Sequence, residues 1–293
     1  MDRHLLTFVT VSKEKNFTRA AEELHLSQSA VSREIETLEI EYGAKLFDRT
    51  NKYVRLTKAG EILYHHAENI LIQQDRAKRL IYDLTHVASG GLSIGSGYTF
   101  GEYILPWIIS DFRHTYPLVT PKITIMNSKR ISTQVHCRAL DLGIVEGDLK
   151  PEDLVIKPFA QDEMMVIVPS THRLSNQSEV DFASLESETW ILRETGSGTR
   201  EVTERVFSKV GFCPLSIMEF GSSQIIKESV EAGLGISLIS KWVIRKEIDY
   251  GLLHALRIKE HPIVRNFSYV IHASQFRTKA MELFLDFLDH FPN

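Results

Sequence analysis

The chain has 293 residues, with 34 Lys and Arg against 38 Asp and Glu, and 43% of the residues are hydrophobic. At about 100–200 residues per domain, this length predicts two or three domains with cores of their own. A net charge of −4 and 25% charged residues exclude a disordered tail protein. No apolar run approaches the ~18 residues of a membrane span, and the N-terminal residues lack a signal-peptide layout. We therefore expect a cytoplasmic protein with no membrane partner.

Charge is distributed unevenly along the chain. Residues 1–58 carry ten basic and nine acidic residues, whereas residues 59–293 carry 24 and 29. Within residues 45–58, a basic strip contains one acid, Asp48, and these bases: Lys45, Arg49, Lys52, Arg55 and Lys58. Attraction to a polyanion acts over about a Debye length, ~8–10 Å, so a local strip matters more than total charge. Taken alone, the strip fits a solvated face equally well.

Three short helices are predicted before the basic strip. Apolar residues recur at three- and four-residue spacing over residues 5–12, which indicates the first helix. Thr18 is expected to cap the second helix, and Ser27 to cap the third. Residues 49–56 then predict a short hairpin. This order of elements is typical of a winged helix-turn-helix.

The third predicted helix has two chemically different faces. Val31, Ile35 and Leu38 form its expected buried stripe. Its other face carries hydrogen-bonding side chains suited to base edges and phosphates in a major groove: Gln28, Ser29, Ser32 and Arg33. A small helical bundle with no ligand is the alternative, and the polar face and basic hairpin argue against it.

Four pieces of sequence make the assignment specific: FTRAA at 17–21, LSQSAVS at 26–32, LFDR at 46–49 and LTKAG at 56–60. In this order they resemble the DNA-binding end of LysR-type transcriptional regulators. The resemblance implies double-stranded DNA with an interrupted palindrome, and RNA polymerase, as partners. It also implies base contacts by Gln28, Ser29 and Ser32, and phosphate contacts by four basic residues: Arg33, Arg49, Lys52 and Arg55.

A long helix is expected over residues 59–88, because neither Pro nor Gly interrupts it after Gly60. Leu63, Ile70, Ala77 and Leu84 recur at seven-residue intervals, which favours a coiled-coil-like seam. An amphipathic helix packed on its own domain is the alternative. The resemblance favours a dimerising linker, and hence a homodimer or homotetramer.

Strands alternate with helical patterns over residues 89–293, which predicts an α/β effector domain. The fold class is therefore a multidomain combination of α+β and α/β: a winged helix-turn-helix (1–58), a linker helix (59–88) and a two-lobed domain. We expect lobe 1 at about 91–161 and 267–293, and lobe 2 at about 162–266. The arrangement resembles the periplasmic-binding-protein-like effector domain of the same family. In such folds a ligand lies in the crevice between the lobes.

A Gly-rich run at residues 194–200 follows a predicted strand and opens a helix. Backbone N–H groups and hydroxyls there can bind an anion, although the same residues are also good turn and cap formers. The segments WILRETGSGTR, IGSGYTFGEYILP and DLGIVEG resemble the family branch that regulates sulfur assimilation and carbon fixation. That resemblance implies a small anionic effector, such as sulfite or a related sulfur compound, and no other cofactor. The implied pocket comprises Thr99, Asn127, Ser128, Ser197, Gly198 and Thr199, with Arg200 or Arg193 supplying charge.

Thr99 and Glu102 stand at capping-box spacing and predict the start of a helix.

Enzymatic patterns are weak in this sequence. Gly91–Gly95 matches G-x-S-x-G, but a helix precedes it and Ser93 falls within a strand. Gly95–Gly101 nearly matches the dinucleotide fingerprint, but its third glycine is one place late. No catalytic residue or metal ligand is assigned. The alternatives are a regulator with another effector, and a binding module or enzyme without specific DNA binding.

Cys137 and Cys213 show no zinc-binding spacing and no disulfide framework. A redox switch is one hypothesis for them, since Arg138 beside Cys137 favours a thiolate. Two buried or inert thiols are the simpler expectation.

Overall fold

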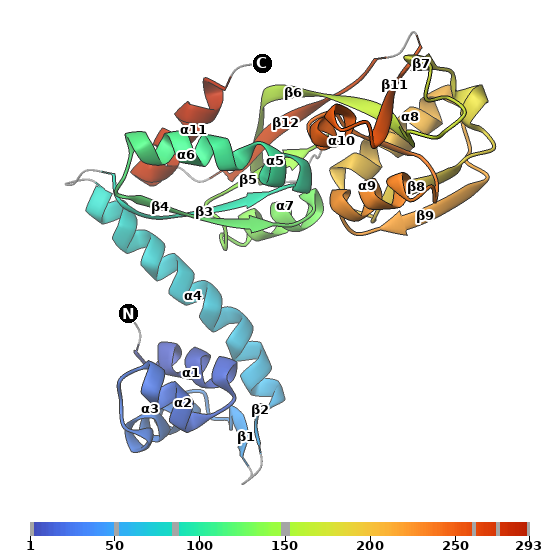
Figure 1. Ribbon diagram of the computed structural model, residues 1–293. Helices are drawn as coiled ribbons and strands as arrows, with labels where there is room; N and C mark the ends of the chain where they lie inside the picture. Colours follow the sequence, from blue (N-terminus) through green and yellow to red (C-terminus); the bar gives the residue numbers. More distant parts are fainter. Residues whose placement is uncertain are drawn as a thin grey trace. The chain divides into compact units, whose positions relative to one another are not determined.

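The computed structural model describes residues 3–49, 53–83, 88–147, 153–259, 262–273 and 276–291. It divides into two compact units, Met1–Thr85 and His86–Asn293. Figure 1 labels the helices and strands of each unit. Among the described residues, no helix is both long enough and apolar enough to cross a membrane.

The first unit contains three helices, a hairpin and a long fourth helix: α1 (Arg3–Glu14), α2 (Phe17–Glu23), α3 (Gln28–Glu41), β1 (Phe47–Arg49), β2 (Val54–Leu56) and α4 (Lys58–Asp83). The stripe Val31, Ile35 and Leu38 is buried, as its periodicity predicts. Leu46 and Phe47 join the same core from the start of the hairpin. The predicted winged helix-turn-helix layout is confirmed.

The cap of α2 differs from the prediction. Asn16, rather than Thr18, is the N-cap, and its Oδ1 accepts hydrogen bonds from the N–H groups of Thr18 (2.8 Å) and Arg19 (3.1 Å). Asn16 has an extended backbone, which suits the capping position, whereas Thr18 already lies inside the helix. Ser27 caps α3 as predicted, accepting from the N–H of Ala30 at 3.2 Å.

The seam predicted on α4 is wrong in its first position. Leu63 is buried in the core of the first unit, together with Ala67 one turn later. Ile70 is 46% exposed, and Ala77 is also exposed, so these residues do not share Leu63's environment. One face of the first turns of α4 is therefore packed in the core of the first unit, whereas Ile62, Ile70 and Ile81 are exposed on the same helix. Leu84 lies outside the described residues.

The second unit is built on ten strands among the described residues: β3 (Gly90–Ser96), β4 (Val119–Ile125), β5 (Leu142–Glu146), β6 (Leu154–Pro169), β7 (Glu179–Val180), β8 (Thr189–Arg193), β9 (Ser216–Phe220), β10 (Ser237–Ser240), β11 (Leu253–Ile258) and β12 (Ile263–His272). The main sheet has the order β4-β3-β5-β12-β6-β11-β7, with β10 also paired to β6. Strands β8 and β9 form a separate parallel pair.

The described helices of this unit cover the sheets on both faces (Figure 1): α5 (Tyr98–Tyr103), α6 (Leu105–Thr115), α7 (Ser128–His136), α8 (Gly198–Val210), α9 (Ser223–Glu231), α10 (Arg245–Asp249) and α11 (Lys279–Asp289). In the first lobe, α6 and α11 share one core with β3 and β5, and α7 packs on the opposite face. In the second lobe, α8 and α9 occupy separate cores. Each lobe is thus a layered α/β structure.

Strands β6 and β12 run through both lobes (Figure 1). They pair antiparallel from Leu154↔His272 to Met164↔Ile263, with an irregularity between Phe267 and Ser268. The apolar segment Met164–Val168 belongs to the second half of the long strand β6. The connection between the lobes is therefore two hydrogen-bonded strands, whose backbone pairing continues across the boundary.

The predicted capping box at Thr99 and Glu102 is wrong. Gly97 is the N-cap of α5, and the first-turn N–H of Phe100 donates to Glu146 Oε1 at 3.2 Å. The Thr99 hydroxyl is fully buried and accepts a hydrogen bond from Arg265 instead. The buried guanidinium of Arg265 needs acceptors, and Glu146 already accepts from the first turn of α5, which explains the difference.

Gly60 provides a test of how α4 is attached to the hairpin. A Cβ at this position would lie 2.1 Å from the backbone oxygen of Leu46 and 2.9 Å from the Leu56 side chain. We expect Gly60→Ala to destabilise the first unit by about 1–3 kcal/mol through overpacking. Calorimetric unfolding of the full chain measures this effect. Gly91→Ala is the control, because nothing lies within 4 Å of its Cβ position, and an equal loss there would contradict the explanation.

Candidate functional site

The N-terminal part of α3 presents polar side chains to solvent. Gln28, Ser29 and Arg33 are exposed, and Ser32 is half-buried. The Gln28 amide donates to the Ser32 hydroxyl at 3.0 Å, and the hydroxyls of Ser29 and Ser27 lie 3.0 Å apart. These contacts orient polar groups at the exposed N-terminal end of α3.

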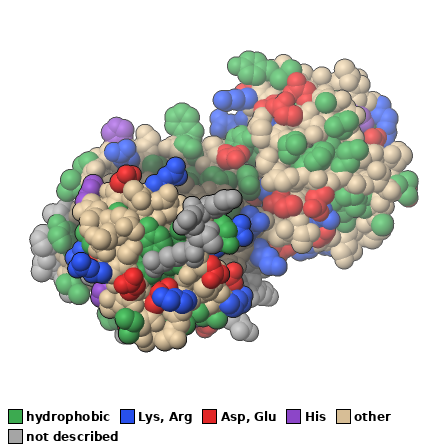
Figure 2. Space-filling view, turned by 90° about the horizontal axis from the view of Figure 1, so that it is seen from below, with side chains coloured by type: hydrophobic (Ala, Val, Ile, Leu, Met, Phe, Trp, Pro, Cys, Tyr) green, Lys and Arg blue, Asp and Glu red, His purple; other side chains and the backbone are tan. Residues whose placement is uncertain are grey.

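The hairpin after α3 provides basic groups of the wing. Arg49 pairs with Val54 across the two strands, and Asp48 pairs with Arg55. The Arg55 side chain is exposed and its guanidinium lies 4.6 Å from the centre of the Tyr53 ring. Lys52 and the side chain of Arg49 lie outside the described residues. On the face seen in Figure 2, Lys and Arg are interspersed with Asp and Glu, so attraction to DNA depends on local groups.

Glu39 connects α3 to this hairpin. Its buried carboxylate accepts hydrogen bonds from Lys45 Nζ at 2.7 Å and from the N–H of Leu46 at 2.9 Å, with a longer one from Phe47 at 3.5 Å. Burial raises the pKa of Glu39, but these donors outweigh it and hold the pKa below its ordinary value of 4.5. The charge of Glu39 therefore fixes the start of the wing relative to the recognition helix.

The second unit brings most of the predicted effector residues together. Thr99, Ser128, Ser197, Gly198 and Thr199 are all buried. They come from three elements, α5, α7 and the start of α8, which belong to both lobes. Their proximity places hydroxyl groups from both lobes around one point.

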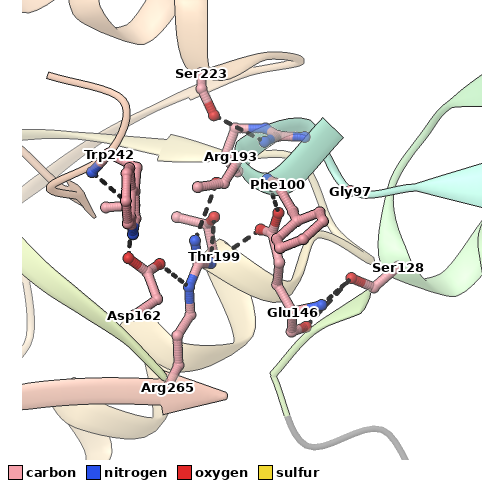
Figure 3. Close-up of polar contacts among 12 residues, drawn as sticks. Gly97, Phe100, Ser128, Glu146, Asp162, Arg193, Thr199, Ser223, Trp242 and Arg265 are labelled. Atoms are coloured by element: carbon pink, nitrogen blue, oxygen red, sulfur yellow. Dashed lines mark hydrogen bonds and ion pairs between the residues drawn. The ribbon is translucent and has the colours of Figure 1, made fainter. Parts of the chain in front are cut away.

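Arg265 on β12 contacts two of these hydroxyls, those of Thr99 and Thr199, and lies beside two carboxylates (Figure 3). Its side chain is 0% exposed. Nε donates to Asp162 at 2.7 Å, and Nη1 lies 3.0 Å from Glu146 Oε2. Nη1 also donates to the Thr199 hydroxyl at 2.9 Å, and Nη2 donates to the Thr99 hydroxyl at 3.0 Å. We call these five residues the interlobe cluster.

Burial and the neighbouring charges of the interlobe cluster shift the pKa values of Arg265 and Asp162. Burial lowers the pKa of Arg265, but Glu146 and Asp162 outweigh burial and raise the pKa above its ordinary value, so the guanidinium stays protonated. Burial raises the pKa of Asp162 above its ordinary 3.8, against the opposing effects of Arg265 and Ser240. One buried cation is thus shared by two carboxyl groups.

Asn127 and Arg200 take positions beside the interlobe cluster. The half-buried Asn127 caps α7 through its Oδ1, and its Nδ2 donates to Glu194 of the second lobe at 3.2 Å. Arg200 faces away from the cluster: its guanidinium contacts Glu204, Glu219 and the backbone oxygen of Arg193. The structure therefore does not bring Arg200 to the predicted pocket.

Arg193 lies closer to the lobe boundary. Its buried guanidinium donates to the Glu194 carboxylate at 2.8 and 3.0 Å and to Ser223 at 3.4 Å. It also lies 4.4 Å from the centre of the Tyr98 ring, which belongs to the first lobe. Of the two arginines considered from sequence, Arg193 is the one that meets both lobes.

Sequence reasoning missed Glu146, Asp162 and Arg265. A signal was present, because each is a charged residue within a strand that is apolar over much of its length. Such residues are rarely buried unless they are paired. The pairing partners, however, lie far apart in sequence.

Gly198 has a structural reason for being glycine. A Cβ there would lie 1.9 Å from the backbone oxygen of Glu146. The second lobe thus approaches the end of β5 so closely at this residue that no side chain fits.

Both cysteines, Cys137 and Cys213, are exposed, so they are not buried thiols, and the expectation that they are inert stays a prediction. In the part of the chain that the structure describes, no group of three or more His, Cys, Asp or Glu side chains is arranged to hold a metal ion.

A capped polar helix with a basic wing, followed by a two-lobed domain with a buried polar centre, defines a DNA-binding transcriptional regulator with a small-molecule effector domain. Comparison with known proteins identifies the family. Residues 3–61 match the family model "Bacterial regulatory helix-turn-helix protein, lysR family", and residues 85–292 match "LysR substrate binding domain". The chain belongs to the LysR family.

Similar proteins come from the two branches expected from sequence. The HTH-type transcriptional regulator CysL of Bacillus subtilis is 37% identical, with 97% of this chain and 95% of CysL covered. A probable RuBisCO transcriptional regulator of Synechocystis sp. is 33% identical, with 94% and 81% covered. These relatives are regulators, so the chain is a transcriptional regulator and not an enzyme.

Solved structures agree on the fold. Full-length CbnR complexed with its target DNA has a TM-score of 0.76 at 21% identity, and the match covers 98% of each chain. The regulatory domain of Synechocystis CcmR in complex with 2-PG has a TM-score of 0.64 at 28% identity, covering 69% of this chain and 96% of that one.

Glu39 gives the first unit a pH-dependent stability. Because its pKa is lowered on folding, its contribution is full above about pH 4.5 and is lost as the pH falls through the folded-state pKa. We expect Glu39→Gln to cost about 1–3 kcal/mol at pH 7 and less at pH 3. Hydrogen exchange at the Leu46 amide in the full chain measures it. Glu36→Gln, an exposed change on the same helix, is the control; the same pH-dependent loss there would refute the assignment.

Proposed function

We propose that the chain binds an interrupted palindrome in double-stranded DNA, as a homodimer or homotetramer, and regulates transcription through RNA polymerase in the bacterial cytoplasm. Base contacts come from Gln28, Ser29 and Ser32. Phosphate contacts come from the basic residues of α3 and the wing: Arg33, Arg49, Lys52 and Arg55. The exposed polar face on the first turns of α3 supports this assignment.

We divide the chain by function into residues 1–58 for DNA binding, 59–88 for dimerisation and 89–293 for the effector. Lobe 1 comprises about 91–161 and 267–293, and lobe 2 about 162–266. Exposed apolar residues on α4 support a dimer contact: Ile62, Ile70 and Ile81. A two-fold pair of helices would bring two recognition helices to the two halves of a palindrome.

The effector in this proposal is a small anionic metabolite, namely sulfite or a related sulfur compound. The observation that carries it is the convergence of Arg265 with the hydroxyls of Thr99 and Thr199 from opposite lobes. Further contacts are assigned to Asn127, Ser128, Ser197 and Gly198. Arg193 replaces Arg200 as the second source of positive charge, because it meets both lobes. The 37% identity to CysL also favours a sulfur compound.

An anion must favour one arrangement of the two lobes in order to act on transcription. Ligand binding shifts a conformational equilibrium only by its difference in affinity for the two states. An anion that contacts both lobes has such a difference in affinity, because all of its contacts can form in only one arrangement of the two lobes.

Base and phosphate contacts are separable by mutation. Ser29→Ala is expected to reduce discrimination between operator and random DNA, since a lost base contact costs about 1–3 kcal/mol. Arg55→Ala should weaken binding to both and reduce the salt slope by about one. Fluorescence anisotropy at several salt concentrations measures the ratio of the two affinities and the salt slope. The operator is first selected from random DNA by the wild-type chain. Thr37→Ala, exposed on the same helix, is the control. An unchanged salt slope for Arg55→Ala would exclude the wing contact.

The effector class is testable by thermal unfolding of the full chain. The panel is sulfite, sulfate, thiosulfate, phosphate, O-acetylserine and phosphorylated sugars. All three Trp residues lie in the second unit, at 107, 190 and 242, so tryptophan fluorescence reports that unit. A ligand at a hundred times its Kd adds ~2.7 kcal/mol and should raise the melting temperature by roughly 5–10 °C. A rise in melting temperature with a sulfur anion supports the proposed effector. No change with any compound of the panel would reject it.

A further inference from the structure

The carboxylate of Glu146 has the surroundings that an anionic ligand would have. Glu146 is the last residue of β5 and its side chain is 3% exposed. Oε2 lies 3.0 Å from Arg265 Nη1, and Oε1 accepts a hydrogen bond from the backbone N–H of Phe100 at 3.2 Å (Figure 3). One guanidinium group and one backbone N–H, with hydroxyls nearby, are the donors that bind carboxylates and other oxyanions in proteins.

Four of the five N–H groups of Arg265 are already used. Nε is bonded to Asp162, Nη1 to Glu146 and Thr199, and Nη2 to Thr99. An oxyanion that binds this guanidinium through two N–H groups must therefore displace at least one of the existing partners. Two of these partners, Asp162 and Glu146, are carboxylates, so the displaced group determines the net charge of the occupied site.

Asp162 is the partner that is built into the sheet. It stands directly opposite Arg265 in the pairing of β6 with β12. Its other oxygen accepts from the Ser240 hydroxyl at 2.6 Å, and that hydroxyl in turn accepts from the N–H of Trp242 at 3.1 Å. Displacing Asp162 would break contacts in three strands or their ends.

Glu146 is held differently. Its backbone is fixed by Ser128, whose hydroxyl bonds to both its oxygen and its N–H. Its carboxylate, however, reaches Arg265 through two methylene groups and is not part of a strand pairing with Arg265. Release of this carboxylate would break side-chain contacts only, without breaking the backbone hydrogen bonds of β5.

Gly97 shows how closely the carboxylate is accommodated. A Cβ at position 97 would lie 2.6 Å from Glu146 Oε1. The Glu146 oxygen therefore lies directly against the backbone that precedes α5. An external oxyanion could take the position of this oxygen only after Glu146 leaves it.

We propose that Glu146 is an internal, displaceable carboxylate that occupies the anion position of the effector site and competes with the effector for Arg265. This inference rests on the proposed anionic effector. It narrows the class to small oxyanions, carboxylates included, that replace one carboxylate on a guanidinium and a backbone N–H. Glu146 then sets the affinity: its release is required for each binding event, and only an anion that binds Arg265 better than the internal carboxylate is effective.

The first test is anion affinity in Glu146→Gln. The variant keeps the shape of the side chain and removes its charge, so it should compete less well for Arg265. Calorimetric titration of the full chain with sulfite, sulfate, thiosulfate and acetate should give a Kd at least tenfold lower than in the wild type for one or more of them. Unchanged or weaker binding of all four would overturn the proposal.

Two control variants show whether tighter anion binding comes from displacing the Glu146 carboxylate or from removing any negative charge. Glu219→Gln removes an exposed carboxylate of the same unit and should leave the Kd unchanged. Asp162→Asn removes the other carboxylate on Arg265 without vacating the Glu146 position, and should give a much smaller gain than Glu146→Gln. An equal gain in Asp162→Asn would mean that net charge alone is responsible, and the proposal would fail.

Chemical rescue of thermal stability by acetate provides a second test, which remains informative when the variant is less stable. Glu146→Ala leaves Arg265 with one ionic partner and should lower the melting temperature of the second unit, followed by tryptophan fluorescence. Acetate should restore it by several degrees more than in the wild type, while the neutral acetamide should not. Equal effects of acetate and acetamide would refute an anion position.

These tests distinguish this inference from the proposed function. If the wild type responds to a sulfur anion but Glu146→Gln binds it no better, the inference fails and the effector class stands. If acetate rescues Glu146→Ala while no sulfur anion binds the wild type or Glu146→Gln, the anion position stands and the sulfur assignment fails.

Discussion

Burial of one guanidinium group at the meeting point of two lobes constrains the whole second unit. Removing a charge from water costs several kcal/mol, and the cost is offset only when counter-charges and hydrogen-bond acceptors lie close by in good geometry. Arg265 receives them from Asp162 on β6, Glu146 on β5 and the hydroxyls of α5 and α8. These elements must therefore converge, and the two long strands that cross between the lobes provide the frame.

The same physical logic operates in the first unit at smaller scale. Glu39 is a buried carboxylate that is stabilised by Lys45 and by backbone N–H groups of the incoming hairpin. Because an unpartnered buried charge is so costly, these donors fix the hairpin on α3. The close approach of Gly60 to Leu46 then ties α4 to the same point. Recognition helix, wing and linker helix thus share one anchoring region.

A buried ionic cluster suits regulation better than it suits stability. Apolar residues of similar volume would often be at least as stabilising as a buried ion pair. An ionic cluster between lobes, however, responds to the charge of a ligand, which an apolar contact does not. The interlobe cluster has one cation and two carboxyl groups, and its hydroxyls come from both lobes. An anion that exchanges with one of these groups changes the contacts between the lobes directly.

Much of the first unit could be predicted from sequence because its determinants are local. Helical periodicity placed Val31, Ile35 and Leu38 in the core and Gln28 and Ser29 outside, and the Ser27 cap follows from its neighbours within one turn. The predicted cap at Thr18 was wrong because Asn16, two residues earlier, is also a good capping residue and takes that position. The alternation of strands and helices also predicted a two-lobed α/β domain, and residues around Thr199 were selected because Gly and hydroxyl side chains open a helix there.

What only the tertiary structure decided is which charges meet. Arg265 is 103 residues from Asp162 and 166 from Thr99, and no local pattern links them. The exposure of Cys137, the burial of Leu63 and the outward position of Arg200 likewise depend on packing between distant elements. Sequence alone determined the class of protein and the location of its two functional regions, since periodicity, capping and motif order act over short distances. The tertiary structure decided the chemistry at the centre of the effector domain, because burial makes a charge depend on whatever the fold brings beside it.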